Sequence, residues 1–293
     1  MAVFDSVTEL LAYCGNTSLP LWEAVMRCSA RESGISAEES WEKMRGRLLV
    51  MEQADASYEP ALRSRSGLSG GDAEKMQRQF QSGGSISGDF IGQILSSALR
   101  MSECNACMRR IVAAPTAGSC GVIPAVLLPY ARRFQTGEDE LVKALYVAAG
   151  FGSVIASRAS ISGAEAGCQA EVGSASAMAA AALVYLHGGR EEQMANAAAI
   201  ALKNMMGLVC DPVAGLVEVP CVKRNVVGAV NAISCADMAL AGVESRIPVD
   251  QVIDCMGEVG RRMPVEFRET ALGGLAVTPA GLAVKERMQR GEF

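Results

Sequence analysis

Apolar residues recur at steps of three and four along most of this chain, a spacing that places them on one face of an α-helix. A helix is predicted from about Asp89 to Arg110. Alternation of apolar and polar residues, which is typical of a strand, is confined to the short segment LVEVP. We therefore predict an all-α, or mostly α, fold. The remaining predicted helices cover residues 138–158, 171–187, 190–205, 222–243 and 248–262.

Two composition changes divide the chain. The first 57 residues are expected to form helices joined by short turns, and two Ser–Glu pairs, Ser6–Glu9 and Ser36–Glu39, have capping-box spacing. Residues 60–89 are rich in Gly and Ser, which predicts a long loop and a change of architecture. We expect a small N-terminal helical segment, residues 1–59, followed by a Gly- and Ala-rich helical domain with long glycine-rich loops, residues 60–293.

The overall charge excludes some classes of partner. The net charge is -5 and the sequence pI is near 5.2, so there is no basic field for nucleic acid or anionic lipid.

The N-terminus has neither a basic region nor an apolar run followed by a cleavage site, so we expect no secretory signal and a cytoplasmic protein. The longest uncharged stretch, residues 172–189, approaches the length of a membrane span. Its Ser, Gly and Ala content favours a buried helix in a soluble protein instead.

Three of the ten cysteines lie in loops flanked by Gly or Pro. These are Cys168, Cys210 and Cys221, with 41 residues between the first two and 10 between the last two. Each thiol is presented from a backbone turn and not along an apolar helix face. In a reducing compartment, such thiols are ligands or redox groups and not a disulfide framework. Three thiolates can hold a metal or an iron–sulfur cluster and leave one position open, where iron acts as a Lewis acid.

The other cysteines fit that pattern less well. Cys104 and Cys107 form a CxxC pair, but no second pair exists and the motif is predicted within a helix, so we set it aside. Cys120, in the loop VAAPTAGSCGVIP, is either a fourth ligand or part of a tight turn. Four further cysteines lie in helical patterns and are expected to be small buried apolar residues, namely Cys14, Cys28, Cys235 and Cys255.

Two glycine-rich loops are candidates for binding an anion. Each precedes a predicted helix, and successive amides with a helix N-terminus favour a carboxylate. The alternative is that both are simple connections. The only histidine, His187, lies at a predicted helix end, where we expect a structural role; this leaves no Ser-His-Asp triad or histidine zinc site. The loop residues are Ser66, Ser69, Gly70 and Gly71 in SGLSGGDAEK, and Thr116 and Ser119 in APTAGSCGVIP.

Four segments together resemble a known family. They are SGLSGGDAEK, APTAGSCGVIPAVL, SGAEAGCQAEVGSASAMAAAALV and NMMGLVCDPVAGLVEVPCVKRN. They look like the alpha chain of the bacterial iron–sulfur L-serine dehydratase, also called L-serine ammonia-lyase. The resemblance runs from about residue 60 to about residue 285, and the N-terminal segment also resembles that of the family.

The resemblance implies a PLP-independent, oxygen-sensitive 4Fe-4S lyase that converts L-serine to pyruvate and ammonia, in amino-acid catabolism and gluconeogenesis. It implies Cys168, Cys210 and Cys221 as cluster ligands and argues against Cys120. The two glycine-rich loops, through Ser66, Ser69, Gly70, Gly71, Thr116 and Ser119, are then expected to hold the substrate carboxylate. Lys75, Asn204, Lys223 and Arg224 are further candidates for polar contacts.

The resemblance also implies a beta subunit, fused or separate, with a Ser- and His-containing loop that has no counterpart in this sequence. The general base stays unassigned: it comes from that partner, or from a cysteine or lysine here with a shifted pKa. Two other functions stay open, an L-cysteine desulfidase-type lyase and a non-enzymatic iron–sulfur carrier or sensor. A structural zinc site is less favoured, because closed zinc sites need four ligands.

Overall fold

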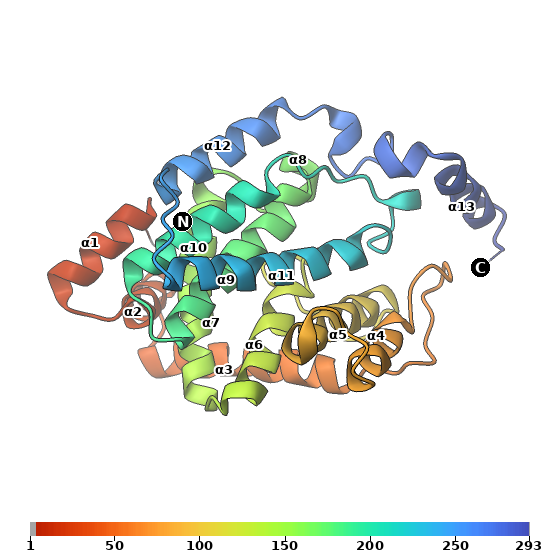
Figure 1. Cartoon of the computed structure of the whole chain (residues 1–293). Helices are drawn as coiled ribbons and strands as arrows, with labels where there is room; N and C mark the ends of the chain where they lie inside the picture. Colours follow the sequence, from red (N-terminus) through yellow and green to blue (C-terminus); the bar gives the residue numbers. More distant parts are fainter. Residues whose placement is uncertain (1–3, 293) are drawn as a thin grey trace.

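The computed structural model describes residues 4–292, and helix α9 (Ser174–Leu186) lies at its centre (Figure 1). Every residue of α9 from Ser174 to Val184 is buried. Most of these residues are Ala or Ser, and their small side chains allow neighbouring helices to approach closely. The helices packed around α9 are α6 (Val122–Phe134), α7 (Glu138–Arg158), α10 (Glu191–Met205) and α11 (Cys221–Leu240). The prediction of a buried helix in residues 172–189 is therefore confirmed.

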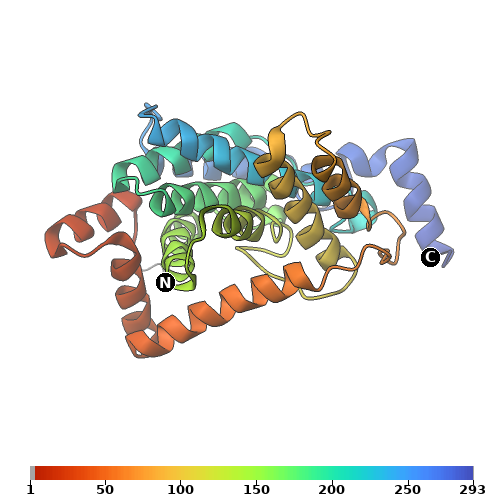
Figure 2. The same cartoon turned by 60° about the horizontal axis from the view of Figure 1, so that its bottom comes forward.

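Three N-terminal helices pack on the same hydrophobic core through α7. Both serines cap their helices, since the Ser6 hydroxyl accepts the Glu9 amide hydrogen and the Ser36 hydroxyl accepts that of Glu39. The Glu9 carboxylate accepts the Asp5 amide hydrogen and not that of Ser6, so the first motif is not a complete capping box. Figure 2 shows the third helix running along one side of the molecule. The three are α1 (Val7–Thr17), α2 (Leu21–Ser33) and α3 (Ala37–Ala56).

The remaining elements surround the glycine-rich loops and the C-terminal part of the chain. The last helix, α13, lies at the opposite end of the molecule from α1 in both views (Figures 1 and 2). The α-helices in this group are α4 (Asp72–Gln81), α5 (Gly88–Ala106), α8 (Gly163–Ala166), α12 (Val249–Arg262) and α13 (Pro279–Gln289). A π-helix covers Gln169–Gly173, and short 3-10 turns cover Val213–Gly215, Val265–Phe267 and Gly274–Val277.

The predicted all-α class is confirmed, because residues 4–292 form thirteen α-helices and no strand. The helix predicted over residues 138–158 has the bounds of α7. The strand candidate LVEVP is a loop instead, and it contains the cis Val219–Pro220 peptide. The long loop predicted over residues 60–89 is wrong in part, since α4 lies within it.

Helix α4 is stabilised by local pairs within the helix and by one distant carboxylate at its start. Its residues after Asp72 are mostly good helix formers, and Glu74 pairs with Arg78 one turn later at 2.8 Å. The buried Glu103 carboxylate also accepts the amide hydrogens of Asp72 and Ala73 in the first turn.

Within residues 4–292, α7 is the one helix long and apolar enough to cross a membrane by length and composition. In its most apolar window, 67% of the helix is buried inside the molecule, as in the core helix of a soluble protein.

Candidate functional site

Three cysteines come together at the ends of three different segments. Cys168 lies between α8 and the π-helix, Cys210 lies in the loop after α10, and Cys221 is the first residue of α11. All three are buried, with 2%, 2% and 7% of their surface exposed, respectively. All three are thus held inside the protein, away from bulk water. The sulfurs of Cys168 and Cys210 lie within 4.8 Å of each other, whereas Cys221 lies outside that group and interacts electrostatically with both.

Backbone contacts bring Cys168 and Cys210 together. Gly167 has a φ of +75°, and a Cβ there would lie 2.8 Å from the Leu208 carbonyl oxygen. Only glycine tolerates both the left-handed conformation and this close approach. The amide of Gln169, the residue after Cys168, donates to the same Leu208 carbonyl at 2.9 Å. The segment that contains Cys168 is therefore held against the segment that leads to Cys210.

Arg224 joins the third segment to the other two. It lies one turn after Cys221 on α11, and its guanidinium donates to the Val209 carbonyl at 2.6 Å and to the Cys168 sulfur at 3.5 Å. It also pairs with the buried Asp211 carboxylate at 2.8 Å. A single side chain of the Cys221 helix thus contacts Cys168 and both neighbours of Cys210.

The three thiols influence one another's protonation. The Cys210 thiol, as a hydrogen-bond donor, and the Arg224 charge lower the pKa of Cys168, although burial opposes this. The pKa of Cys210 is raised, first by that hydrogen bond and then by burial. Burial, followed by the charges on Cys168 and Glu171, raises the pKa of Cys221. The set therefore favours one thiolate, and a bound cation is needed before all three lose their protons.

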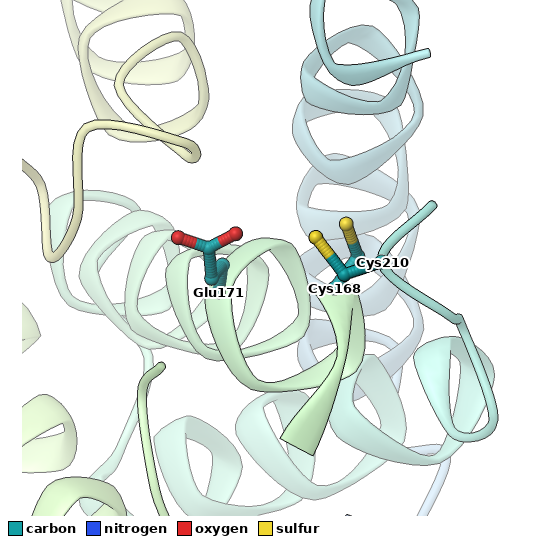
Figure 3. Close-up of side chains that lie close together, drawn as sticks. All are labelled: Cys168, Glu171 and Cys210. Carbon is teal, nitrogen blue, oxygen red and sulfur yellow. The ribbon is translucent and has the colours of Figure 1, made fainter. Parts of the chain in front are cut away.

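Glu171 lies beside the cysteines, which the sequence reasoning missed. Its carboxylate and the sulfurs of Cys168 and Cys210 all lie within 4.8 Å of one another. In Figure 3 the three side chains point to the same side. The available signal was spacing, because a residue three positions after Cys168 shares its helix face when the segment is helical.

The loop of Thr116 and Ser119 reaches the site. The Thr116 hydroxyl donates to the Glu171 carboxylate at 2.8 Å and is 3.0 Å from the Ser119 hydroxyl. Asn225, on α11, fixes the loop by accepting the Gly121 amide hydrogen and donating to the Gly118 carbonyl, both at 2.8 Å. One of the two predicted anion loops is therefore held against Glu171, beside the cysteines.

In the other loop, one of the predicted donors, the Ser66 hydroxyl, is engaged by a protein side chain. The Ser66 hydroxyl donates to Glu218, a buried residue three positions before Cys221. Gly70 and Gly71 precede α4, whose first amides donate to Glu103, as described above. The Ser69 hydroxyl is buried without a hydrogen-bond partner within residues 4–292. The loop is thus joined to the Cys221 segment through Glu218.

The four further polar candidates differ in what they contact. Arg224 contacts Cys168, as described above. Lys75 and Lys223 both pair with Asp72 of α4. Asn204 donates to Asn231, away from the cysteine segments. Only Arg224 of these four therefore contacts a candidate ligand.

Cys120 and His187 have other surroundings. Cys120 is buried, its sulfur lies 4.0 Å from the Met101 carbonyl of α5, and burial raises its pKa to about 12. His187 follows the last residue of α9, and its Nδ1 is 3.2 Å from the Tyr130 hydroxyl. Neither side chain is grouped with Cys168 and Cys210.

The cysteines predicted to be core residues give one correction. Cys14, Cys28 and Cys235 are buried, as expected, but Cys255 is exposed, because it lies on the solvent side of the amphipathic helix α12. The prediction that the CxxC pair lies within a helix is also wrong for Cys107, which is one residue beyond the end of α5.

Comparison with known proteins gives the family. Residues 16–276 match the model of the family described as serine dehydratase alpha chain. This chain belongs to that family. It is 47% identical to the probable L-serine dehydratase alpha chain of Bacillus subtilis (strain 168), across 98% of this chain and 95% of the relative. It is 40% identical to the L-serine dehydratase alpha chain of Peptoniphilus asaccharolyticus, across 97% of each.

A third relative is longer. L-serine dehydratase 1 of Escherichia coli (strain K12) is 38% identical, and the match covers 94% of this chain but 62% of the E. coli protein. The family thus includes alpha chains of this length and larger proteins that contain the same region. The resemblance found from the cysteine-centred motifs is confirmed.

Proposed function

We propose that this chain is the alpha subunit of an L-serine ammonia-lyase, which converts L-serine to pyruvate and ammonia with a 4Fe-4S cluster on Cys168, Cys210 and Cys221. The observation that carries the proposal is the convergence of three buried thiols in a chain whose relatives are named L-serine dehydratase alpha chains.

The donor set suits an iron–sulfur cluster. Soft thiolates select iron–sulfur clusters or zinc, and no histidine lies among these donors. The pKa of Cys210 is raised first by its hydrogen bond with Cys168, and that of Cys221 first by burial, so a bound cation would favour loss of both protons. Three thiolates also leave one metal position without a protein sulfur, as a substrate-activating site requires.

The chain's own residues orient the substrate. When bound, the cluster supplies a Lewis acid that makes the serine hydroxyl a better leaving group. Arg224 and Asp211 hold the Cys168 and Cys210 segments in register. The loop of Thr116 and Ser119 is the better placed of the two to bind the substrate carboxylate, because it contacts Glu171 beside the cysteines. The Ser66–Gly71 loop is joined to the site through Glu218, which lies three residues before Cys221 and accepts from the Ser66 hydroxyl.

A beta subunit is proposed as the source of the general base. The only histidine, His187, is 3.2 Å from the Tyr130 hydroxyl and is not grouped with the cysteines. The relatives named alpha chain, and the greater length of the E. coli protein, support a second polypeptide or domain.

We also propose that the protein works in the cytoplasm. All ten of its cysteines are free thiols, which suits a reducing compartment.

The proposal is tested by anaerobic reconstitution with iron and sulfide, followed by a pyruvate assay with L-serine and with L-cysteine. The assay is run with and without the beta chain that accompanies this protein. Replacement of Cys168, Cys210 or Cys221 singly by Ser should remove the cluster and lower activity at least about 100-fold, since each is a ligand. Cys107→Ser is the control and should retain both.

Full activity in any of the three ligand variants would contradict the ligand assignment. Turnover of L-cysteine but not L-serine would identify a desulfidase-type lyase. A bound cluster with no turnover of either amino acid, even with the beta chain, would favour a carrier or sensor.

A further inference from the structure

The Glu171 carboxylate is placed for a role other than packing. It lies within 4.8 Å of the sulfurs of Cys168 and Cys210 and points to the same side as both (Figure 3). It comes from the π-helix that follows Cys168, and π-helical turns are frequent at functional sites.

Two glycines make room for this carboxylate. A Cβ at Gly118 would lie 2.7 Å from both Glu171 oxygens, and a Cβ at Gly163 would lie 2.7 Å from Oε2. Any other residue at either position would displace the carboxylate. Thr116 then fixes its direction by donating to Oε1 at 2.8 Å. The two glycines thus leave space for the carboxylate, and Thr116 orients it.

The charges around Glu171 favour a cation. Within residues 4–292 it has no ion-pair partner, and the neighbouring Glu269 adds a second negative charge near Gly163. The nearest cation at the cysteines, Arg224, is already engaged by Asp211, Val209 and Cys168.

We propose that Glu171 binds the α-ammonium group of the amino-acid substrate and so makes the site selective for amino acids over hydroxy acids. The inference rests on the proposed function. Thr116 joins the ammonium-binding carboxylate to the loop proposed for the substrate carboxylate, so the two charged groups on one substrate carbon meet adjacent parts of the site. Serine is a zwitterion, and the site then offers a partner for each charge.

A rival role for Glu171 is that of a metal ligand, because its oxygens are close to two thiols. The two roles differ in what Glu171→Gln should do. This change keeps the shape and an oxygen that can accept from Thr116, and it removes the charge. If Glu171 binds the ammonium group, iron and sulfide content should be unchanged and the KM for L-serine should rise about 10- to 100-fold, with a smaller effect on kcat.

A substrate analogue gives a readout that a structural role would not move. 3-Hydroxypropanoate is serine without its amino group. Its inhibition constant should be the same in the parent and in Glu171→Gln, while the KM for L-serine rises. The matched control is Glu165→Gln, an exposed glutamate three residues before Cys168 whose carboxylate accepts from Ser160 at 2.6 Å. It should change neither quantity.

Three results would overturn the inference. The first is loss of iron in Glu171→Gln. The second is an unchanged KM for L-serine. The third is a rise in the inhibition constant of 3-hydroxypropanoate equal to the rise in the KM for L-serine. If the parent does not turn over serine at all, the proposed function fails separately. Calorimetric titration of L-serine and 3-hydroxypropanoate into parent and variant then decides the inference: selective loss of L-serine affinity supports it, and equal affinities refute it.

Discussion

At the scale of single residues, Arg224 connects the parts of the site. Its guanidinium reaches residues beside Cys168 and Cys210 from a position one turn after Cys221. Its partner Asp211 also accepts the Leu275 amide hydrogen at 2.8 Å, so the pair extends to the C-terminal part of the chain. Both side chains are largely buried, with 15% and 4% exposed. Each of these two buried charges is stabilised by the other, so removal of one leaves the other without a partner.

Arg224→Gln should therefore destabilise the folded protein by about 3–5 kcal/mol, because it leaves the Asp211 carboxylate buried without its cation. Asp211→Asn should also be destabilising. The double variant should lose clearly less than the sum of the two, since neither charge is then left alone. Urea unfolding of the four proteins measures this coupling. Additive losses would show that the two side chains act independently.

Residue patterns identified the cysteines but not the carboxylates. Cys168, Cys210 and Cys221 were found because glycine- and proline-flanked thiols are unusual in a helical chain. Glu171 and Asp211 have no such mark, since acidic residues are common and their burial depends on distant segments. Arg224 was named only as one of four polar candidates, because its contacts to Cys168 and Val209 arise from tertiary packing.

At the scale of elements, small residues set the distances between helices. Gly260 of α12 packs against α8, and a Cβ there would lie 2.4 Å from the Ala166 Cβ and 3.0 Å from its Cα. Ala166 is two residues before Cys168, so this helix contact supports a ligand segment. Neither neighbouring atom belongs to a flexible side chain.

Gly260→Ala should destabilise the protein by about 1–3 kcal/mol through overpacking, and it should lower the iron content by displacing the Cys168 segment. Gly46→Ala is the matched control in another helix interior, exposed and with no atom within 4 Å of the added Cβ. It should stabilise the protein by about 0.5–1 kcal/mol, because alanine is the better helix former. Equal effects in thermal unfolding and iron analysis would contradict this reading of the helix contact.

Helices were predicted well where the apolar period was long, and poorly in glycine-rich regions. The predicted range 138–158 matches α7, and range 190–205 lies within one residue of α10. Helix α4 was missed because Gly and Ser on both sides hid ten helical residues. Its N-terminus depends on Glu103, which is 31 residues away from Asp72, and local composition carries no trace of that contact.

At the scale of the whole molecule, the C-terminal part of the chain lies against the ligand loop. The Cys210 amide donates to the Phe267 carbonyl, and the Glu269 amide donates to the Cys210 carbonyl, both at 2.8 Å. Glu269 adopts a φ of +63°, which is uncommon for a residue other than glycine. Helix α13 follows, and only Gly281 in it is buried. The segment before α13 therefore matters more to the site than α13 itself.

Two truncations separate these parts. A chain that ends at Thr278 lacks α13 and should retain close to the parent's iron content and thermal midpoint, since little of α13 is buried. A chain that ends at Met263 also loses the backbone bonds to Cys210 and the Leu275–Asp211 bond, and its iron content should fall sharply. Reconstitution followed by iron analysis compares them. Full iron content in the shorter chain would refute a supporting role for residues 264–278.

The hydrogen bonds between Cys210 and residues 267–269 affect when the site can be completed during translation. A ribosome makes the chain from its N-terminus, so Cys168, Cys210 and Cys221 emerge well before the segment that steadies the middle one. The proposed cluster site gains its full backbone support only after residues 267–269 have been made. A nascent chain stalled before Phe267 would therefore hold its three thiols without that support.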